Sequence, residues 1–390
     1  MMFDHLIGDQ RPIGWVFQFW PVMAGSFGSG LAATWLCKRI ALKFGIVDRP
    51  NATVKTHREP IAYLGGVGIL VGLIVGMLTG LYQLREQPGF GKAFEWLMGI
   101  AAGASIACVV GVIDDIFDLK PGRKISGQLI ASAALLMAGI RPAFHSFTSP
   151  LGISLSEPME TALGIPVVMF FVLGATNSLN LLDGLDGLCG GVTAIIAGAM
   201  LILAAHLSTW GFSETGDPVR VIVCLALVGG VFGFLPFNRH PAKIFMGDAG
   251  SMLLGFTVAA LMILFAERIP RWWMASIVVF GLPILDTATA MVRRLINRRP
   301  LFVSDRGHIY DQLMDRGMTL RQAVKTCYAL AAGYAAIGLL MSQIRTRYAL
   351  VVYIVVSVLS AGVIWKRGFL RMEGIRGAIR NIDMKMSDKD

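Results

Sequence analysis

The chain has 390 residues, of which 55% are hydrophobic and 15% are charged, and its formal net charge is +10. Because soluble domains carry about 25% charged residues, this composition excludes an ordinary soluble enzyme and indicates an integral membrane protein in contact with membrane lipids. The positive charge is spread over short loops and is not gathered on one module, so we expect no nucleic-acid partner.

Apolar runs follow one another along the whole chain. A run of about 17–25 residues crosses a hydrocarbon core about 30 Å thick. The sequence therefore predicts an all-α, polytopic membrane protein with about 11 transmembrane helices, near residues 19–37, 62–83, 94–113, 125–140, 162–180, 188–206, 219–236, 251–266, 272–292, 323–343 and 348–365. No long soluble stretch separates these runs, so residues 1–365 are predicted to form one membrane domain and residues 366–390 a basic cytoplasmic tail.

The distribution of basic residues predicts the orientation in the membrane. Most of the 35 lysines and arginines lie on alternate loops, all on one face of the predicted topology. Because lysine and arginine favour cytoplasmic loops, we expect the N-terminus outside and the C-terminus in the cytoplasm. The polar motifs that follow all lie on the predicted cytoplasmic side, as an active site assembled from several loops requires.

The third apolar run ends in "CVVGVIDDIFDLKPGRK", where Asp114 and Asp115 are adjacent and two lysines, Lys120 and Lys124, follow. Adjacent carboxylates repel each other, and a cation relieves this repulsion. Mg²⁺ prefers a few carboxylates together with phosphate oxygens of a substrate. The alternative is a solvated helix end at the membrane border.

The stretch "NSLNLLDGLDG" joins two apolar runs. Its polar residues Asn177, Asn180, Asp183 and Asp186 recur every three residues, which keeps them on one face of a helix. Two glycines interrupt this helix and allow a close approach of backbone or ligand. A polar contact between helices is the alternative, but it does not require two carboxylates.

Three further loops on the same side carry polar residues. The stretch "FNRHPAKIFMGDAGS" contains Asn238, Phe245 and Asp248, a later loop contains His308, and the first loop contains Lys55. Carboxylates suit a metal ion and cations suit phosphates. Because phosphoryl transfer consists mostly of positioning and charge neutralisation, this inventory indicates transfer between a soluble phosphate donor and a membrane component.

These stretches, in this order, resemble the polyprenyl-phosphate N-acetylhexosamine-1-phosphate transferases; "NLLDGLDGL" and "FMGDAGS" are the most specific motifs. The resemblance implies an enzyme of the bacterial inner membrane that depends on Mg²⁺, with Mn²⁺ as the alternative ion. It would move a sugar-1-phosphate from a UDP-sugar to undecaprenyl phosphate or another polyprenyl phosphate and release UMP. It also allows a homodimer.

The resemblance also implies roles for individual residues. Asp248 would bind the metal together with Asp115, and Asp114 and Asp115 would form the catalytic pair. The substrate-binding residues would be Lys55, Lys120, Lys124, Asn177, Asn180, Asp183, Asp186, Asn238, Phe245 and His308.

The loop around His308 bears on the sugar donor. Members that transfer phospho-N-acetylmuramoyl-pentapeptide have three consecutive histidines there, and members that use UDP-N-acetylglucosamine commonly read H-x-H-H. This chain reads "DRGHIYDQLMDRG", with Tyr310 and Asp311 at the later two positions. The surrounding loop favours N-acetylglucosamine, and the muramoyl donor stays an alternative.

Two other classes fit part of the sequence. The pattern D-D-x-x-D in "DDIFD" also suits an intramembrane prenyltransferase, but such an enzyme does not need the loop that contains Asp248. Carboxylates within membrane helices also suit a transporter. A transporter should carry them near the middle of the membrane in broken helices, whereas these carboxylates gather at one face.

Overall fold

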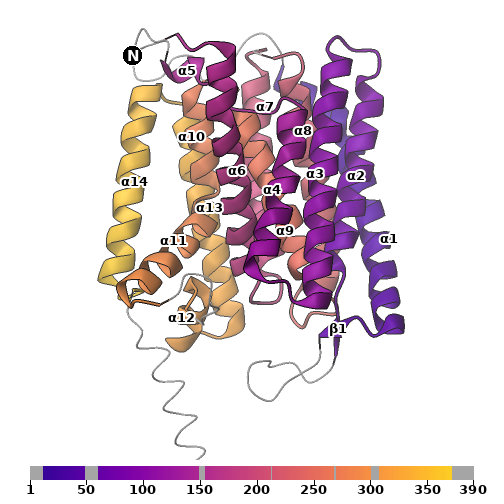
Figure 1. The fold of residues 1–390 in the computed structure, drawn as a ribbon, viewed down its shortest axis with the longest axis vertical. Helices are drawn as coiled ribbons and strands as arrows, with labels where there is room; N and C mark the ends of the chain where they lie inside the picture. The colour runs from indigo at the N-terminus through magenta and orange to yellow at the C-terminus, as the bar shows by residue number, and fades with distance from the viewer. Residues whose placement is uncertain are drawn as a thin grey trace, which may run out of the picture.

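The computed structural model describes residues 12–48, 60–148, 154–211, 213–267, 269–299 and 307–370. The protein is an upright bundle of helices (Figure 1), which confirms the all-α prediction. The elements are η1 (Ile13–Phe19), α1 (Trp20–Phe44), β1 (Val47–Asp48), β2 (Ile61–Ala62), α2 (Gly65–Leu84), α3 (Phe90–Phe117), α4 (Pro121–Met137), α5 (His145–Thr148), α6 (Glu157–Leu182), α7 (Leu188–Ser208), α8 (Gly216–Asn238), α9 (Gly247–Phe265), α10 (Pro270–Val279), α11 (Gly281–Ile296), α12 (Ile309–Asp315), α13 (Leu320–Ser342) and α14 (Thr346–Lys366).

Each of the eleven predicted apolar runs coincides with a helix or a helix pair. Within the described residues, eight helices are long and apolar enough to cross a membrane, or nine if the bent pair α10–α11 is one span. The two remaining predicted runs correspond to α1, which carries Lys38, Arg39 and Lys43, and to α4, which has only 17 residues. The chain is a multi-pass membrane protein, and the number of eleven spans is not confirmed.

The run predicted as one helix over 272–292 is two helices. A break at Phe280 separates α10 from α11, and the two helix axes are bent by 68°. Pro283 lies just after the break, and a proline removes a backbone donor and clashes with the preceding turn of a continuous helix. Helix α11 therefore leaves the direction of α10 and runs obliquely at the lower left of the bundle (Figure 1).

Helices α8 and α9 form the centre of the bundle. In their most apolar 18-residue stretches, 89% and 94% of the residues are buried inside the protein, against 11% for α14 at the periphery. Glycines bring α9 against its neighbours. A Cβ on Gly66 of α2 would lie 2.2 Å from the backbone nitrogen of Gly250, and one on Gly111 of α3 would lie 2.3 Å from that of Ala249. Small residues allow such backbone contact between membrane helices. The first turn of α9 is therefore held between α2 and α3.

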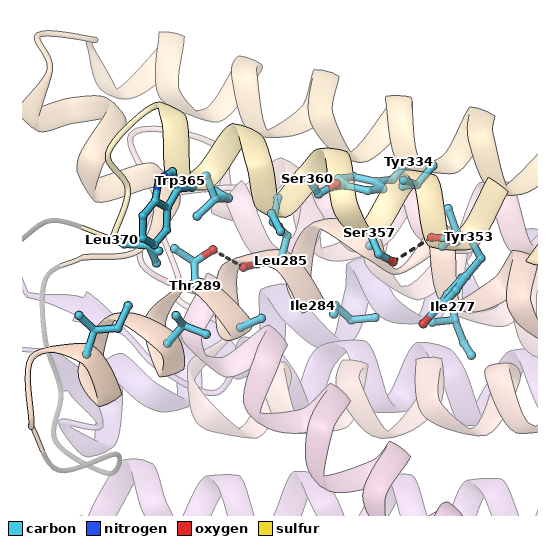
Figure 2. A pocket seen from close by; sticks show the side chains of 18 residues that line it. Ile277, Ile284, Leu285, Thr289, Tyr334, Tyr353, Ser357, Ser360, Trp365 and Leu370 are labelled. Atoms are coloured by element: carbon cyan, nitrogen blue, oxygen red, sulfur yellow. Dashed lines mark hydrogen bonds between the residues drawn. The ribbon is translucent and has the colours of Figure 1, made fainter. Parts of the chain in front are cut away.

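An apolar cavity of about 440 Å³ lies between α11, α13 and α14 (Figure 2). Two of its hydroxyl groups are bonded to the helix backbone: Ser357 donates to the carbonyl of Tyr353, and Thr289 donates to that of Leu285. The cavity shares no lining residue with the polar cavity at the lower end of the bundle. It lies along one face of α11 only.

Candidate functional site

The polar motifs meet at the end of the bundle that is at the bottom of Figure 1, where α3 turns into α4, α6 into α7 and α8 into α9. A cavity of about 820 Å³ opens there. Its charged lining consists of five carboxylates and two lysines, with His240 beside them: Asp48, Asp115, Asp183, Asp186, Asp248, Lys38 and Lys243. Negative charge therefore exceeds positive charge around the cavity.

Lys124 of α4 joins three helices at the edge of this cavity. Its Nζ lies 2.7 Å from an oxygen of Asp114 on α3, contacts the carboxylate of Asp248 on α9, and donates to the amide oxygen of Asn180 on α6 at 3.4 Å. The amide nitrogen of Asn180 donates to Asp248 at 2.6 Å. The structure thus brings together four of the predicted site residues from distant parts of the chain.

Asp115 caps the first turn of α9. Its two carboxylate oxygens accept hydrogen bonds from the backbone nitrogens of Asp248 (2.8 Å) and Ala249 (3.2 Å). A carboxylate at a helix N-terminus satisfies free N–H groups and is stabilised by the helix dipole. Asp115 therefore has a structural task in addition to the metal and catalytic roles that the resemblance implies.

The turn between α6 and α7 supplies Asp183 and Asp186. Asp186 accepts hydrogen bonds from His240 (2.7 Å) and from the backbone nitrogen of Ala242 (3.1 Å), so it ties this turn to the loop before α9. No group among the described residues donates a hydrogen bond to Asp183. Burial, followed by the charges of Asp248, Asp115 and Asp186, raises the pKa of Asp183 well above its usual range.

Asn238 ends α8, and Phe245 lies in the loop between α8 and α9. The buried amide of Asn238 accepts from the backbone nitrogen of Gly187 (3.1 Å) and donates to the carbonyl of Ile244 (3.0 Å). Phe245 pairs with β2 through its nitrogen, which donates to the carbonyl of Ala62 at 2.9 Å. Its ring lines the cavity, so Asn238 fixes the loop and Phe245 offers an aromatic surface.

His308 lies beside the cavity and not in its lining. Its ring is buried, its Nδ1 is 2.7 Å from the carboxylate of Asp286, and it stacks on Tyr310 with the ring centroids 5.7 Å apart. The hydroxyl of Tyr310 donates to the carbonyl of Leu181 (3.3 Å). Burial raises the pKa of Asp311, the next carboxylate, to about 6.

The remaining predicted residues lie elsewhere. Asn177 donates to Gln128 of α4 (3.0 Å) and to the carbonyl of Leu173, so it makes a contact between helices. Lys120 is exposed before the first turn of α4. Lys55 lies outside the described residues.

Several residues that line the cavity were not predicted as site residues, among them Lys38, Asp48 and Tyr63. Lys38 lies on the last turns of α1, and Asp48 and Tyr63 lie in or beside the two-stranded ribbon β1–β2. Burial and the charge of Asp48 raise the pKa of the Tyr63 phenol. The polar stretch "VDRP" beside a short apolar strand was the available signal for Asp48; nothing local identified the other two.

The donor groups around the cavity suit a hard divalent cation, because they are carboxylate oxygens and one of them, Asp183, has no hydrogen-bond donor in the described part of the chain. Over the same residues, no three histidine, cysteine, aspartate or glutamate side chains are grouped closely enough to hold a metal ion by themselves. A site of this kind fits an ion that takes its other ligands from water and substrate phosphates.

Replacing Gly247 with alanine is expected to destabilise the protein. Gly247 has φ +68°, and a Cβ there would lie 2.3 Å from the Asp115 carboxylate. The left-handed conformation alone costs a non-glycine residue about 1–2 kcal/mol. We expect the thermal unfolding midpoint in detergent to fall by several degrees. Gly122→Ala is the control, since a Cβ there meets nothing within 4 Å; equal midpoints for both variants would contradict this account.

Comparison with known proteins agrees with this arrangement. Residues 97–266 match glycosyl transferase family 4. A probable undecaprenyl-phosphate N-acetylglucosaminyl 1-phosphate transferase of Bacillus subtilis is 32% identical over 305 residues, which cover 77% of this chain and 78% of that protein.

Two other relatives differ from each other in the group that their names give as transferred. An undecaprenyl-phosphate alpha-N-acetylglucosaminyl 1-phosphate transferase of Yersinia pestis is 29% identical and covers 80% of each chain. A phospho-N-acetylmuramoyl-pentapeptide-transferase of Bacillus thuringiensis is 30% identical over 65% of this chain and 74% of its own. At this identity and coverage, the chain belongs to the polyprenyl-phosphate N-acetylhexosamine-1-phosphate transferases of glycosyl transferase family 4.

Proposed function

We propose that the protein transfers N-acetylglucosamine-1-phosphate from UDP-N-acetylglucosamine to a polyprenyl phosphate and releases UMP. The observation that carries this proposal is the cavity at one end of a membrane bundle, where five carboxylates, two lysines and Phe245 line one space. Such a cavity offers contacts for a cation, for phosphates and for a base. Its place at the helix ends allows a soluble donor and a lipid phosphate to meet.

The reaction is a displacement at phosphorus. An oxygen of the lipid phosphate forms a bond to the sugar-proximal phosphorus of the donor, and the bond from that phosphorus to the bridging oxygen breaks, with the electron pair leaving on UMP. Lys124, Lys38 and Lys243 offset negative charge on the phosphates. Asp114 keeps Lys124 in place through the 2.7 Å ion pair.

The nucleotide end of the donor fits the loop between α8 and α9. Phe245 presents a ring to the cavity, and Tyr63 lies beside it with the ring centroids 6.2 Å apart. An aromatic ring can stack on any base, because every base has a flat π-face. Asn238 and Asp186 hold the loop that carries Phe245.

Asp248 and Asp183 are the residues that would hold Mg²⁺. The ion would supply charge neutralisation for the diphosphate and for the leaving UMP. Asp115, whose oxygens accept two backbone hydrogen bonds, would fix the position of Asp248 beside that ion.

The distribution of lysine and arginine supports a cytoplasmic location for this end of the bundle. UDP-sugars are highly charged and soluble, so the donor must reach the site from an aqueous compartment. We therefore place the active site at the cytoplasmic face of a bacterial plasma membrane.

The experiment that tests the function is UMP release by purified protein given polyprenyl phosphate, Mg²⁺ and one donor at a time. We expect release with UDP-N-acetylglucosamine and little with UDP-N-acetylmuramoyl-pentapeptide. The longer coverage of the N-acetylglucosaminyl relatives supports this choice. Release with the muramoyl donor only would assign the protein to the alternative branch, and no release with either would contradict the proposal.

A further inference from the structure

Helix α11 has two chemically different faces. One face lines the apolar cavity with residues such as Leu285 and Thr289 (Figure 2). Other residues of the same helix make polar contacts outside that cavity: Asp286 binds His308, and Thr287 donates to Ser178 of α6 at 2.9 Å. The fully buried carboxylate of Asp286 is therefore directed at the segment before α12, and not into the apolar cavity.

Asp286 holds both the ring and the backbone at this point. One of its oxygens is 2.7 Å from Nδ1 of His308, and the other accepts from the backbone nitrogen of Ile309 at 2.6 Å. With the Asp286 carboxylate as the acceptor at both of its oxygens, the hydrogen between it and the ring is carried by Nδ1. The other ring nitrogen, Nε2, is then the one left for a further contact.

The segment around His308 is fixed from several sides. The carbonyl of Gly307 accepts from Arg293 of α11 and from Gln312 of α12 (2.9 Å). The backbone nitrogen of His308 donates to Asp311 (3.3 Å). The histidine therefore has a defined position immediately before α12, and its ring orientation depends on Asp286.

Tyr310, which stacks on His308, reaches the turn that carries the cavity carboxylates. His308 stacks on Tyr310 with an angle of 13° between the rings, and a Cβ on Gly184 would lie 2.0 Å from the Tyr310 hydroxyl. Gly184 lies between Asp183 and Leu185 in the cavity lining. Only the ring of Tyr310 therefore lies between the Asp286–His308 pair and the turn that lines the cavity.

We propose that Asp286 is a positioning residue that fixes the tautomer and orientation of His308, so that Nε2 is directed at a phosphate of the substrates. This inference rests on the proposed function. Two other titratable groups interact electrostatically with the pair, Asp311 of α12 and Cys327 of α13, while Asp183 after α6 interacts with the neighbouring Tyr310. None of these replaces the contact that Asp286 makes with Nδ1.

The test is a double-mutant cycle in UMP release. Asp286→Asn is expected to lower the rate about 10–100-fold, by analogy with the loss of a carboxylate that orients a metal-binding histidine. If Asp286 acts through His308, the double variant Asp286→Asn/His308→Gln should be no slower than His308→Gln alone. Asp286→Glu keeps a carboxylate and should recover part of the activity. Losses that multiply in the double variant would overturn the inference.

A second measurement does not depend on activity. The protein is labelled with ¹⁵N-histidine and its ring nitrogens are observed by NMR. The signals of His308 are those that vanish in His308→Gln, and in the wild type they should show a proton on Nδ1. Asp286→Asn should change this signal, and Thr289→Val, which alters the cavity face of α11, should leave it unchanged. An unchanged signal in Asp286→Asn would overturn the inference. If the wild type releases no UMP, the proposed function fails and the ring signal still decides the role of Asp286.

Discussion

Replacing Asp248 with asparagine is expected to lower the rate of UMP release about 1000-fold, a loss of the size seen when one preorganised charge is removed from a reacting centre. Asp248 lines the cavity and is the point where Lys124 and Asn180 converge. Asparagine has the same shape and keeps an oxygen for the amide of Asn180. The change therefore removes a negative charge with little loss of packing.

The control for this substitution is Glu95→Gln, an exposed carboxylate of α3 at the opposite end of the bundle. Its rate should stay within twofold of the wild type. Both variants should unfold within a few degrees of the wild type in detergent. Activity retained in Asp248→Asn would refute the assignment of this carboxylate to the metal.

The second large effect is expected for Lys124→Gln, with a rate lowered about 100–1000-fold. Lys124 bridges Asp114 and Asp248, and its loss leaves these carboxylates close together with no cation between them. Like charges at short range repel each other more strongly away from bulk water. A divalent ion should then stabilise the variant more than the wild type, because it takes over the role of the missing charge.

This prediction has two measurements, the rate of UMP release and the rise in unfolding temperature on adding Mg²⁺. Arg123→Gln is the matched control, because Arg123 is the exposed residue next to Lys124. It should resemble the wild type in both. If Lys124→Gln keeps full activity, or if Mg²⁺ raises its unfolding temperature less than that of the wild type, the bridge between the two carboxylates does not have the role assigned to it.

The positions of the helices could be predicted from the sequence because each apolar run is long enough to leave a clear signal. The break between α10 and α11 could not be predicted from hydropathy, since both halves are apolar. Pro283 was the local sign of it, but a proline in a membrane helix produces anything from a mild kink to a full break. The 68° bend depends on how α11 packs against its neighbours.

The convergence of Asn180, Asp248 and Lys124 followed from the sequence for a topological reason. Helices that alternate in direction bring every second turn to the same end of a bundle, and each of these residues lies near such a turn. Asn177 lies three residues earlier along α6 and donates to Gln128 of α4, so the spacing alone did not bring it to this cluster, and its substrate-binding role stays a prediction.

Contacts between segments that are distant along the chain could not be predicted from the sequence. Tyr63 lies beside β2, which contacts the loop before α9 through the bond from Phe245 to Ala62, and Lys38 comes to the same cavity from the end of α1. Asp286 and His308 are 22 residues apart, and no periodicity relates them. Such pairings depend on tertiary packing, which a local pattern does not encode.

The central claim is that the protein moves a sugar together with its phosphate, and the fate of the donor's second phosphorus tests it most directly. UDP-N-acetylglucosamine labelled with ³²P at the sugar-proximal phosphate is incubated with purified protein, Mg²⁺ and polyprenyl phosphate, and the lipid is then extracted. We predict that the label enters the lipid fraction while unlabelled UMP is released in equal amount. Label that stays in the aqueous phase as UDP, with the sugar alone on the lipid, or no transfer at all, would contradict the account.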